Sequence, residues 1–589
     1  MAAIAVLLAA ADTYVVVVVL PDIMNGVGLG IDRLQRATPI ISGFLLGYTA
    51  VLPLIGRIAD VAGTAPTLAW CLGAFATGSI VTATAHSLPV VVVGRAIQGV
   101  GGGGLVPVTM AMVAARWRPD ERGTPLGIVG ALQELGSVIG PLYGAAIVAV
   151  ADWRAIFWIN VPVTIVLGIG FWTAGRLEPG SDLMAPSARR AGHRDVPGAV
   201  LVLAGIVVTV VGLDAPARLV TDPTWGQLYN PLAAGEWSPF TTPVVLIGLG
   251  LLFLAALWEL VAPAGIRPMA PLRRSSAVLA RSDLPGAALL AGVLACIVVA
   301  FSTADPSRQV LASSAPVVVP LGFSLALAFW WRQRRAGAPL LERGAFSRRP
   351  AWGGLLVNLA LGGGLMAALI DVPLFARSTV DPGSETSAAL VLLRFLVAVP
   401  IGAVVGGVLC RNRGRAAYVA AAGMSLATIG FIAMSWWSAT ALGGGPRPSD
   451  IEMIVCGFGF GLAIAPVNVA VLGAVDSRHH ALAGALAVVA RTIGMLAGLS
   501  VLTAVALRRF YEAESRIGSP LELCPSHPES CPAYDHASTQ AILGELHTIF
   551  AGAAVCTGVA GVLALILLRP ARELLPDGET TVPLTELAQ

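Results

Sequence analysis

The chain of 589 residues is 56% hydrophobic and only 12% charged, with a mean hydropathy of +0.80. A soluble domain carries about 25% charged residues, so most of the surface of this protein must face lipid. The net charge of +3 is too small to indicate a nucleic-acid partner, and all 37 basic residues are arginine. A chain without lysine has neither a P-loop nor a Schiff base, which excludes an ATP-binding motor of that kind within it.

Apolar segments long enough to cross a membrane follow one another along the chain. A helix needs about 20 residues to span the hydrocarbon core, and no segment alternates with the two-residue period of a barrel strand. The first segment contains Asp12 and lacks a basic start and a small-residue cleavage site, which indicates a membrane helix and not a signal peptide. We therefore expect an all-α polytopic membrane protein of sixteen spans, with fourteen as the alternative, at about 2–21, 39–58, 66–85, 89–114, 124–149, 155–174, 198–214, 243–262, 284–302, 315–331, 351–375, 387–410, 416–437, 451–475, 482–507 and 546–568.

The arginines favour one side of the membrane. If both termini are cytoplasmic, 24 of the 37 arginines lie in cytoplasmic loops, 10 in outer loops and 3 within spans. Four dense clusters then share the cytoplasmic side: Arg116–Arg122, Arg189–Arg194, Arg273–Arg281 and Arg332–Arg335. Positively charged loops remain inside, so we expect a multi-pass protein of the cell inner membrane with cytoplasmic termini.

The middle of the chain contains a repeated pattern. Asp195 to Ala199 read D-V-P-G-A, and Asp283 to Ala287 read D-L-P-G-A, each an Asp cap followed by Pro in the first helical turn. The two starts are either unrelated caps or copies of one hairpin, and the length and charge of the hairpins favour duplication. The expected organisation is a six-helix bundle, a linker with two hairpins, a second six-helix bundle with an outward extension at 508–545, and a cytoplasmic tail, at 1–175, 176–345, 346–569 and 570–589.

Four motifs follow in order along the first half. The loop after the second span reads G-R-I-A-D-V-A-G and includes Gly56, Asp60 and Gly63, and the fourth span contains R-A-I-Q-G from Arg95. The fifth span reads G-S-V-I-G-P-L-Y-G, with Gly136, Gly140, Pro141 and Gly144. The stretch from Trp153 to Pro162 reads W-R-A-I-F-W-I-N-V-P.

Together these motifs resemble those of the major facilitator superfamily. The third resembles its antiporter signature, and the fourth is similar to a segment of its fourteen-helix drug:proton antiporter branch. The segments around Asp12, Asp22, Glu134, Asp371 and Arg491 are similar to those of the mycobacterial triacylglyceride exporter family, which works beside a periplasmic lipoprotein. The resemblance covers both six-helix halves but not the linker, where the family has one hairpin. It implies two bundles that rock in alternating access, coupled to protons, with a lipid, an amphiphile or a drug as substrate.

The cytoplasmic gate motif departs from the family pattern. Thr64, Ala65 and Pro66 follow Gly63 where the family has basic residues. The corresponding loop of the second half has Arg411, Arg413 and Arg415, with arginine in place of the acid. We expect these two loops to hold one acid and several bases between them.

Charged residues inside spans are costly and usually functional. We expect Asp12 and Glu134 to carry protons and Arg491 to be the counter-charge that pairs with either, because a nearby arginine favours the ionised carboxylate. Arg95 is expected to brace the helices and the proton site. Asp371 and Arg394 either form a salt bridge with each other or take part in transport.

The remaining features bear on rival functions. None of the seven histidines lies deep in a span, which argues against an intramembrane enzyme, and no Cys/His cluster has metal-ligand spacing. Motifs in both halves suit rocking bundles better than a channel. We expect a secondary transporter, a monomer without cofactors, whose partners are protons, a lipid or amphiphile and a periplasmic lipoprotein. A multidrug:proton antiporter is the alternative.

We expect the last two spans to extend as helices beyond the membrane; a charged surface loop with partial helix is the alternative. The segment from Leu482 to Ile517 lacks Pro and would run about 54 Å as a helix, and the final helix could begin near Ala537. The arginine distribution places the connecting loop outside, where thiols oxidise. We therefore expect a disulfide between Cys524 and Cys531 that closes the tip of this extension; free surface thiols are the alternative.

Overall fold

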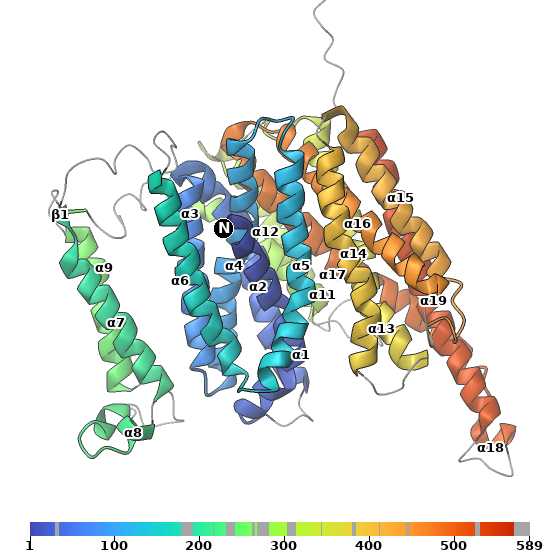
Figure 1. Cartoon of the computed structure of the whole chain (residues 1–589), viewed down its shortest axis with the longest axis horizontal. Helices are drawn as coiled ribbons and strands as arrows, with labels where there is room; N and C mark the ends of the chain where they lie inside the picture. The colour runs from blue at the N-terminus through green and yellow to red at the C-terminus, as the bar shows by residue number, and fades with distance from the viewer. Residues whose placement is uncertain are drawn as a thin grey trace, which may run out of the picture.

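The structure is a computed structural model of the whole chain. It describes residues 1–29, 34–177, 193–215, 217–230, 242–261, 266–267, 282–302, 314–337, 339–342, 344–379, 385–410, 413–442, 447–524 and 531–569. Almost all of these residues are helical, because in lipid an apolar chain must satisfy its backbone polar groups within each segment. Figure 1 shows the long helices standing roughly side by side.

The first six helices form one bundle. Within it α1 packs on α5, α2 on α4, and α3 on both α4 and α6. Gly63 precedes α3 and has a φ of +99°, a backbone conformation that glycine adopts readily. The helix α4 begins with proline in its first turn. The bounds are α1 Ala2–Gly26, α2 Leu34–Ala62, α3 Thr64–Ala83, α4 Leu88–Arg116, α5 Gly123–Val148 and α6 Arg154–Leu177.

The last six long helices repeat that packing. Here α13 packs on α17, α14 on α16, and α15 on both α16 and α19, the same pairs in the same order as in the first bundle. The chain therefore has two six-helix halves of one design. The bounds are α13 Arg349–Thr379, α14 Glu385–Leu409, η5 Arg413–Arg415, α15 Ala416–Met434, α16 Pro448–Gly473, η6 Ser477–His479, α17 His480–Glu514, α18 Pro520–Leu523 and α19 Pro532–Leu567.

The two halves meet most closely at the arginine-rich end of the bundle. There α5 crosses α14: a Cβ atom on Gly123 would lie 2.4 Å from the carbonyl oxygen of Gly407, and one on Gly127 would lie 2.6 Å from that of Ala403. Only glycine allows helices to approach so closely. The helices α2 and α4 also contact α17 across the same boundary. This end of the molecule is tightly closed.

The linker contains both expected hairpins. The first consists of α7 Val196–Asp214 and α9 Pro243–Val261, with the short elements β1 His193–Arg194, α8 Ala217–Val220, η3 Gly226–Tyr229 and β2 Ile266–Arg267. It stands at the left of Figure 1 and has few contacts with the bundles. The second consists of α11 Leu284–Ser302 and α12 Ala315–Arg335, and α11 packs against α2 and α17. The second hairpin thus lies where the halves meet.

The hairpins begin in the same way. The carboxylate of Asp195 accepts a hydrogen bond from the amide of Gly198 at 2.8 Å, and that of Asp283 accepts one from the amide of Gly286 at 3.2 Å. Each aspartate also reaches the second helix of its hairpin, Asp195 through Trp258 Nε1 at 2.9 Å and Asp283 through Arg332 Nε at 2.8 Å. The shared construction supports the duplication proposed from the sequence.

All sixteen expected spans are helices. Among the described residues thirteen are long and apolar enough to cross a membrane, and the bent helix α1 makes fourteen. The two helices of the first hairpin have shorter apolar stretches, Val200–Leu213 and Pro243–Trp258. The first hairpin is therefore what separates a count of fourteen from a count of sixteen.

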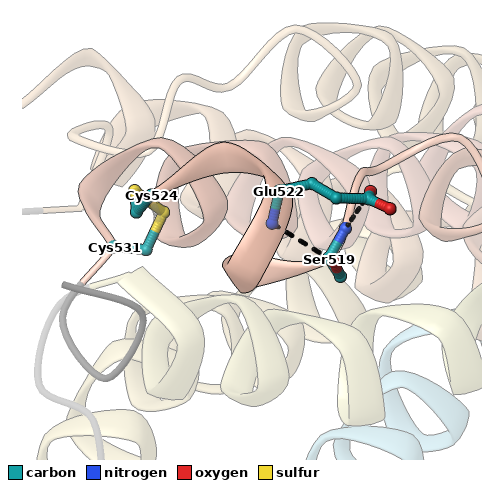
Figure 2. Close-up of a disulfide and its surroundings, with 4 residues drawn as sticks. All are labelled: Ser519, Glu522, Cys524 and Cys531. Carbon is teal, nitrogen blue, oxygen red and sulfur yellow. Dashed lines mark hydrogen bonds between the residues drawn. A yellow bond between two sulfur atoms is a disulfide. The ribbon is translucent and has the colours of Figure 1, made fainter. Parts of the chain in front are cut away.

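The helices α17 and α19 have 35 and 36 residues, longer than any other helix in the described chain. At 1.5 Å per residue each runs for over 50 Å, well beyond a hydrocarbon core of about 30 Å. Their far ends meet at α18, at the lower right of Figure 1. Beside α18 a disulfide joins Cys524 and Cys531, whose Cα atoms are 5.6 Å apart (Figure 2).

Candidate functional site

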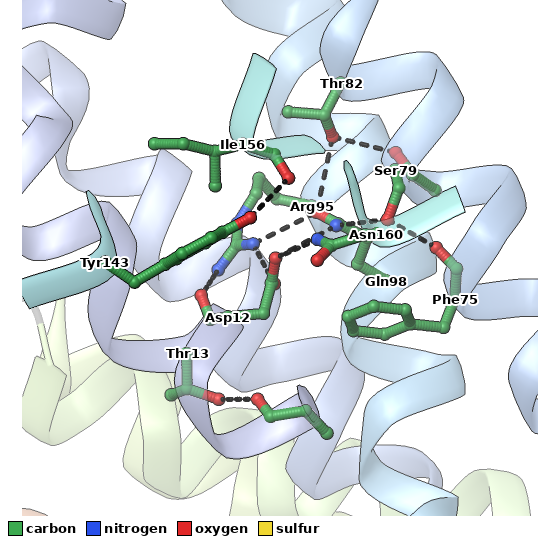
Figure 3. Close-up of polar contacts among 12 residues, drawn as sticks. Asp12, Thr13, Phe75, Ser79, Thr82, Arg95, Gln98, Tyr143, Ile156 and Asn160 are labelled. Carbon is green, nitrogen blue, oxygen red and sulfur yellow. Dashed lines mark hydrogen bonds and ion pairs between the residues drawn. The ribbon is translucent and has the colours of Figure 1, made fainter. Parts of the chain in front are cut away.

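A buried network surrounds Asp12 in the middle of the first half (Figure 3). Asp12 is 3% exposed and its Oδ2 lies 2.5 Å from Nη1 of Arg95, which is 1% exposed. Its Oδ1 accepts a hydrogen bond from Asn160 Nδ2 at 2.7 Å and a longer one from Gln98 Nε2 at 3.4 Å. Gln98 Nε2 also donates to the hydroxyl of Ser79 at 2.8 Å. The network therefore includes residues of four helices, α1, α3, α4 and α6.

Arg95 is fixed on both its edge and its face. Its Nη1 also donates to Oε1 of Gln98 at 3.0 Å, and its guanidinium lies over the ring of Phe44, 4.3 Å from the ring centre. A buried ion pair is tolerated only when hydrogen bonds satisfy the remaining polar atoms, and here most are satisfied. Arg95 thus contacts Asp12 of α1, Gln98 of α4 and Phe44 of α2.

The glycine motif of α5 sets the distance between α5 and α1. A Cβ atom on Gly136 would lie 2.6 Å from the carbonyl oxygen of Leu7, and one on Gly140 would lie 2.5 Å from that of Ala11. One on Gly144 would lie 2.5 Å from a methyl group of Val15. Pro141 lies within the same helix. The motif thus presses the α1 segment that carries Asp12 against α5.

Glu134 and Arg491 form an ion pair between the two halves. Glu134 lies on α5 and Arg491 on α17, and Oε1 of the glutamate is 2.9 Å from Nη1 of the arginine. Both side chains are largely buried, with 10% and 12% of their surfaces exposed. Glu134 is about 16 Å along α5 from Gly123, near the middle of the helix. The structure therefore pairs Arg491 with Glu134 and pairs Asp12 with Arg95.

The G-R-I-A-D-V-A-G motif, which begins at Gly56, contacts the start of α17. Oδ1 of Asp60 accepts a hydrogen bond from the amide of Ala481 at 2.9 Å, and Oδ2 accepts one from the amide of Leu482 at 3.0 Å. A carboxylate at a helix N-terminus satisfies free amides and interacts well with the helix dipole. A Cβ atom on Gly56 would lie 2.8 Å from the carbonyl oxygen of Ala481, so glycine is needed for this approach.

A side chain of the linker completes that contact. Oε1 of Glu342, between α12 and α13, is 3.1 Å from Nη2 of Arg57, and its Oε2 is 3.0 Å from Nε2 of His479. Burial raises the pKa of Glu342, but the hydrogen bond from Arg57 and the charge of His479 outweigh it, so the pKa lies below its usual value. Glu342 thus ties the first half, the linker and the second half at one point. We call Arg57, Asp60, Glu342 and His479 the latch.

The other expected gate residues take less part. Gly63 is the turn residue before α3. Arg413 and Arg415 form the short helix η5, and Arg415 is exposed just before α15. Arg411 lies outside the described residues. In the first of the two motifs, Arg57 meets an acid of the linker, Glu342.

The suggested pairing of Asp371 with Arg394 is wrong. Arg394 forms its ion pair with Asp450 on α16, since the helical phase of α14 turns it toward that helix. Asp371 is 2% exposed on α13, and its Oδ2 makes no hydrogen bond within the described part of the chain. The two residues belong to different sites.

Four participants were not identified from the sequence. Gln98 and Asn160 stand within the recognised motifs, so their motif membership was the available signal. Glu342 and His479 lie in or next to loops, and only the folded chain brings them to Arg57. Within the described residues no three His, Cys, Asp or Glu side chains are grouped as a metal site requires.

The two buried ion pairs differ in whether they join the two halves of the transporter. Asp12 and Arg95 lie in the same half, whereas Glu134 and Arg491 belong to different halves and separate if the halves move apart. A carboxylate that loses its arginine in a dry site binds a proton more readily. The geometry can therefore link proton binding to the relative position of the halves.

Known proteins agree with this architecture. Residues 2–499 match the Major Facilitator Superfamily. A triacylglyceride transporter of Mycolicibacterium hassiacum is 33% identical over 578 residues, which cover 95% of this chain and 89% of that protein. A triacylglyceride transporter of Mycobacterium tuberculosis is also 33% identical, over 576 residues that cover 95% of this chain and 92% of that protein.

Among solved structures, a superfamily transporter named FucP, in the outward conformation, is similar with a TM-score of 0.47 and 15% identity. The match covers 96% of this chain and 97% of that chain, and it is too distant to support an argument of its own. The family match and the full-length relatives are decisive, and they make this protein a transporter and not an enzyme. The chain belongs to the Major Facilitator Superfamily.

Proposed function

We propose that this protein is a proton-coupled secondary transporter that exports a lipid or amphiphilic molecule by alternating access. The observation that carries the proposal is the Glu134–Arg491 ion pair, which joins the two halves at 2.9 Å in a largely buried setting. Placing an acid within the membrane costs free energy, so acids found there usually have a function. A pair that only one conformation can form gives that function a physical basis.

The proposed cycle uses the pair as a proton switch. While Arg491 is close, Glu134 remains ionised, and when the halves rearrange the carboxylate loses its partner and takes up a proton. Asp12 stays beside Arg95 in both conformations and supplies the second acid, fixed by Asn160 and Gln98. Protonation thus changes the relative free energies of the two conformations, which is what coupling requires.

The latch determines which conformation is described. Asp60 and Glu342 hold the arginine-rich end closed, and the charge rule assigns that end to the cytoplasm. In an alternating-access cycle, a conformation closed at the cytoplasmic end is one that faces outward. We propose a multi-pass protein of the cell inner membrane with both termini cytoplasmic, working as a monomer.

A lipid is favoured as the substrate by two observations. Relatives at 33% identity over nearly the whole chain are named triacylglyceride transporters. In addition α17 and α19 extend past the membrane on the outer side, where a lipid must be kept from water after it leaves the transporter. A periplasmic lipoprotein is the partner that would receive it.

The test is reconstitution into liposomes with an imposed proton gradient. Extraction of a fluorescent triacylglyceride and efflux of a hydrophobic cationic dye are measured on the same preparation. We expect gradient-dependent movement of the lipid and little movement of the dye. Dye efflux without lipid movement would contradict the lipid assignment and favour a drug:proton antiporter, and equal rates with and without the gradient would contradict proton coupling.

A further inference from the structure

Asp283 makes a contact that its counterpart in the first hairpin lacks. Asp283 and Asp195 each cap the first helix of a hairpin through one carboxylate oxygen, Oδ1. The other oxygen of Asp283, Oδ2, accepts a hydrogen bond from the backbone amide of Leu340 at 3.1 Å. The other oxygen of Asp195 is buried and has no hydrogen-bond partner within the described residues. The two hairpins therefore begin alike, but the second is tied to a further segment of the chain.

Several contacts hold the carboxylate of Asp283 in place. Its side chain is 1% exposed, and its Oδ1 lies 2.8 Å from Nε and 2.7 Å from Nη2 of Arg332, in the last turn of α12. A buried charge needs such charge-assisted hydrogen bonds, which fix its position. The backbone of Asp283 has a φ of +46°, in the left-handed region that Asp and Asn tolerate better than most residues. The carboxylate thus joins α11, α12 and Leu340 at one buried point.

Leu340 connects Asp283 to the latch. Its side chain is fully buried, and it stands two residues before Glu342, a reach of about 7 Å at most along the chain. The side chain of Glu342 is 35% exposed, so its own packing holds it weakly. Its two oxygens nevertheless meet Arg57 of the first half and His479 of the second half. Fixing Leu340 therefore restricts where the carboxylate of Glu342 lies.

The second hairpin lies across the boundary between the halves. Its helix α11 packs against α2 of the first half and α17 of the second. Leu294 of α11 shares a hydrophobic cluster with Leu52 of α2 and Val489 of α17. Farther along α11, the carbonyl oxygen of Phe301 accepts a hydrogen bond from the hydroxyl of Ser500 at 3.4 Å. The hairpin thus contacts both halves in the conformation in which the latch is closed.

We propose that Asp283 is a positioning residue of the latch: it ties the second hairpin to Leu340 and so holds Glu342 between the two halves. The second hairpin then stabilises the conformation that is closed at the arginine-rich end. Asp195 has no part in the latch, so the two hairpins differ in role although they begin alike. The inference rests on the proposed function, because a latch acts only in a protein whose halves alternate between two conformations.

Asp283→Asn tests the tie with little change of shape. Asparagine is a good helix cap and keeps one oxygen for Gly286, but its amide group cannot accept the hydrogen bond from Leu340. Opening is measured by maleimide labelling of Cys410, which is 1% exposed beside the crossing of α5 and α14. We expect Asp283→Asn to label about 2- to 12-fold faster than wild type, the effect of one hydrogen bond on the equilibrium. Asp195→Asn is the matched control and should label like wild type.

A double variant distinguishes positioning from general loosening. Glu342→Gln should itself accelerate labelling, and Asp283→Asn/Glu342→Gln should label no faster than Glu342→Gln alone, because Asp283 acts through Glu342. Two independent losses would instead multiply their effects on the rate. Multiplied effects, a wild-type rate in Asp283→Asn, or equal acceleration in Asp195→Asn would each overturn the proposal. A wild-type rate in Glu342→Gln would overturn the latch itself, and with it the assignment of the closed end, so the two failures are told apart.

Hydrogen exchange of the wild-type protein tests the contact without any substitution. A buried hydrogen bond slows exchange, so the amide of Leu340 should exchange slowly although Leu340 lies outside the helices. In Asp283→Asn the same amide should exchange faster, whereas in Asp195→Asn its exchange should be unchanged. Rapid exchange at Leu340 in wild type would mean that the tie does not form and would exclude the proposal.

Discussion

Replacing Gly407 by valine puts a branched side chain where α5 and α14 cross. The first added carbon would lie 2.5 Å from the carbonyl oxygen of Gly123 and 2.9 Å from Cα of Gly127, and both contacts are with backbone that cannot turn aside. The strain exists only while the two halves touch at this end. Overpacking of this kind costs about 1–3 kcal/mol, which shifts the balance toward the open conformation by about 5- to 150-fold.

Cys410 is a native reporter for that opening. It lies next to the crossing and is 1% exposed, and burial raises the pKa of its thiol from 9.0 to about 12. Only the thiolate reacts with maleimide, so the closed protein should label very slowly. When the halves separate, the thiol regains water and its usual pKa, and the labelling rate follows the open population. We expect Gly407→Val to label at Cys410 about 5- to 150-fold faster than wild type, measured by peptide mass spectrometry.

Two controls separate opening from general damage. Gly423→Val makes an equally close contact, 2.6 Å from the carbonyl oxygen of Gly459, but within the second half. Gly168→Val lies on α6, where an added carbon would meet nothing within 4 Å. Neither should change labelling of Cys410. The reasoning fails if Gly407→Val labels like wild type, or if Gly423→Val accelerates labelling to the same extent.

Three further predictions concern the latch, the extension and the linker. Glu342→Gln should favour the conformation that is open at the arginine-rich end, as measured by spin-label distances between the two halves. In wild type the latch should persist at neutral pH and weaken only as the pH falls through the lowered pKa of Glu342. The variant should lack this loss at acid pH. Cys524→Ser/Cys531→Ser removes a disulfide that, by restricting the unfolded chain, stabilises the fold by about 2–3 kcal/mol. The double variant should release lipid to an acceptor more slowly, while its membrane insertion is unchanged. Free labelling of both thiols in the non-reduced wild type would contradict this. A topology reporter fused near Ser307 should be found outside and one near Ala336 inside, and the same location for both would mean that the second hairpin does not cross.

The helices were predictable because each span has to satisfy its own backbone. Every expected span is a helix, and the long α17 and α19 follow from uninterrupted segments without a breaker. Pairing was partly predictable. Arg491 was expected to meet either Asp12 or Glu134, and the fold resolves that choice through the face of α17 that turns toward α5.

Other contacts depend on distances that no local pattern contains. Arg394 and Asp371 lie on consecutive helices at similar depths, yet the rotation of α14 sends the arginine to Asp450. Glu342 reaches Arg57 only because the second hairpin packs against α2 and α17 and delivers the end of the linker to the latch. Sequence motifs therefore located the acids within the membrane, while the partner of each acid required the packed bundle.

Proton coupling through the two buried acids is the central claim, and gradient-driven transport by acid variants tests it most directly. Asp12→Asn and Glu134→Gln are compared with wild type in liposomes that carry a proton gradient, with Asp152→Asn, an exposed acid paired with Arg154, as the matched control. The account predicts that both buried-acid variants lose gradient-driven lipid export although they insert and fold, and that the control keeps it. Wild-type rates in both Asp12→Asn and Glu134→Gln would contradict it.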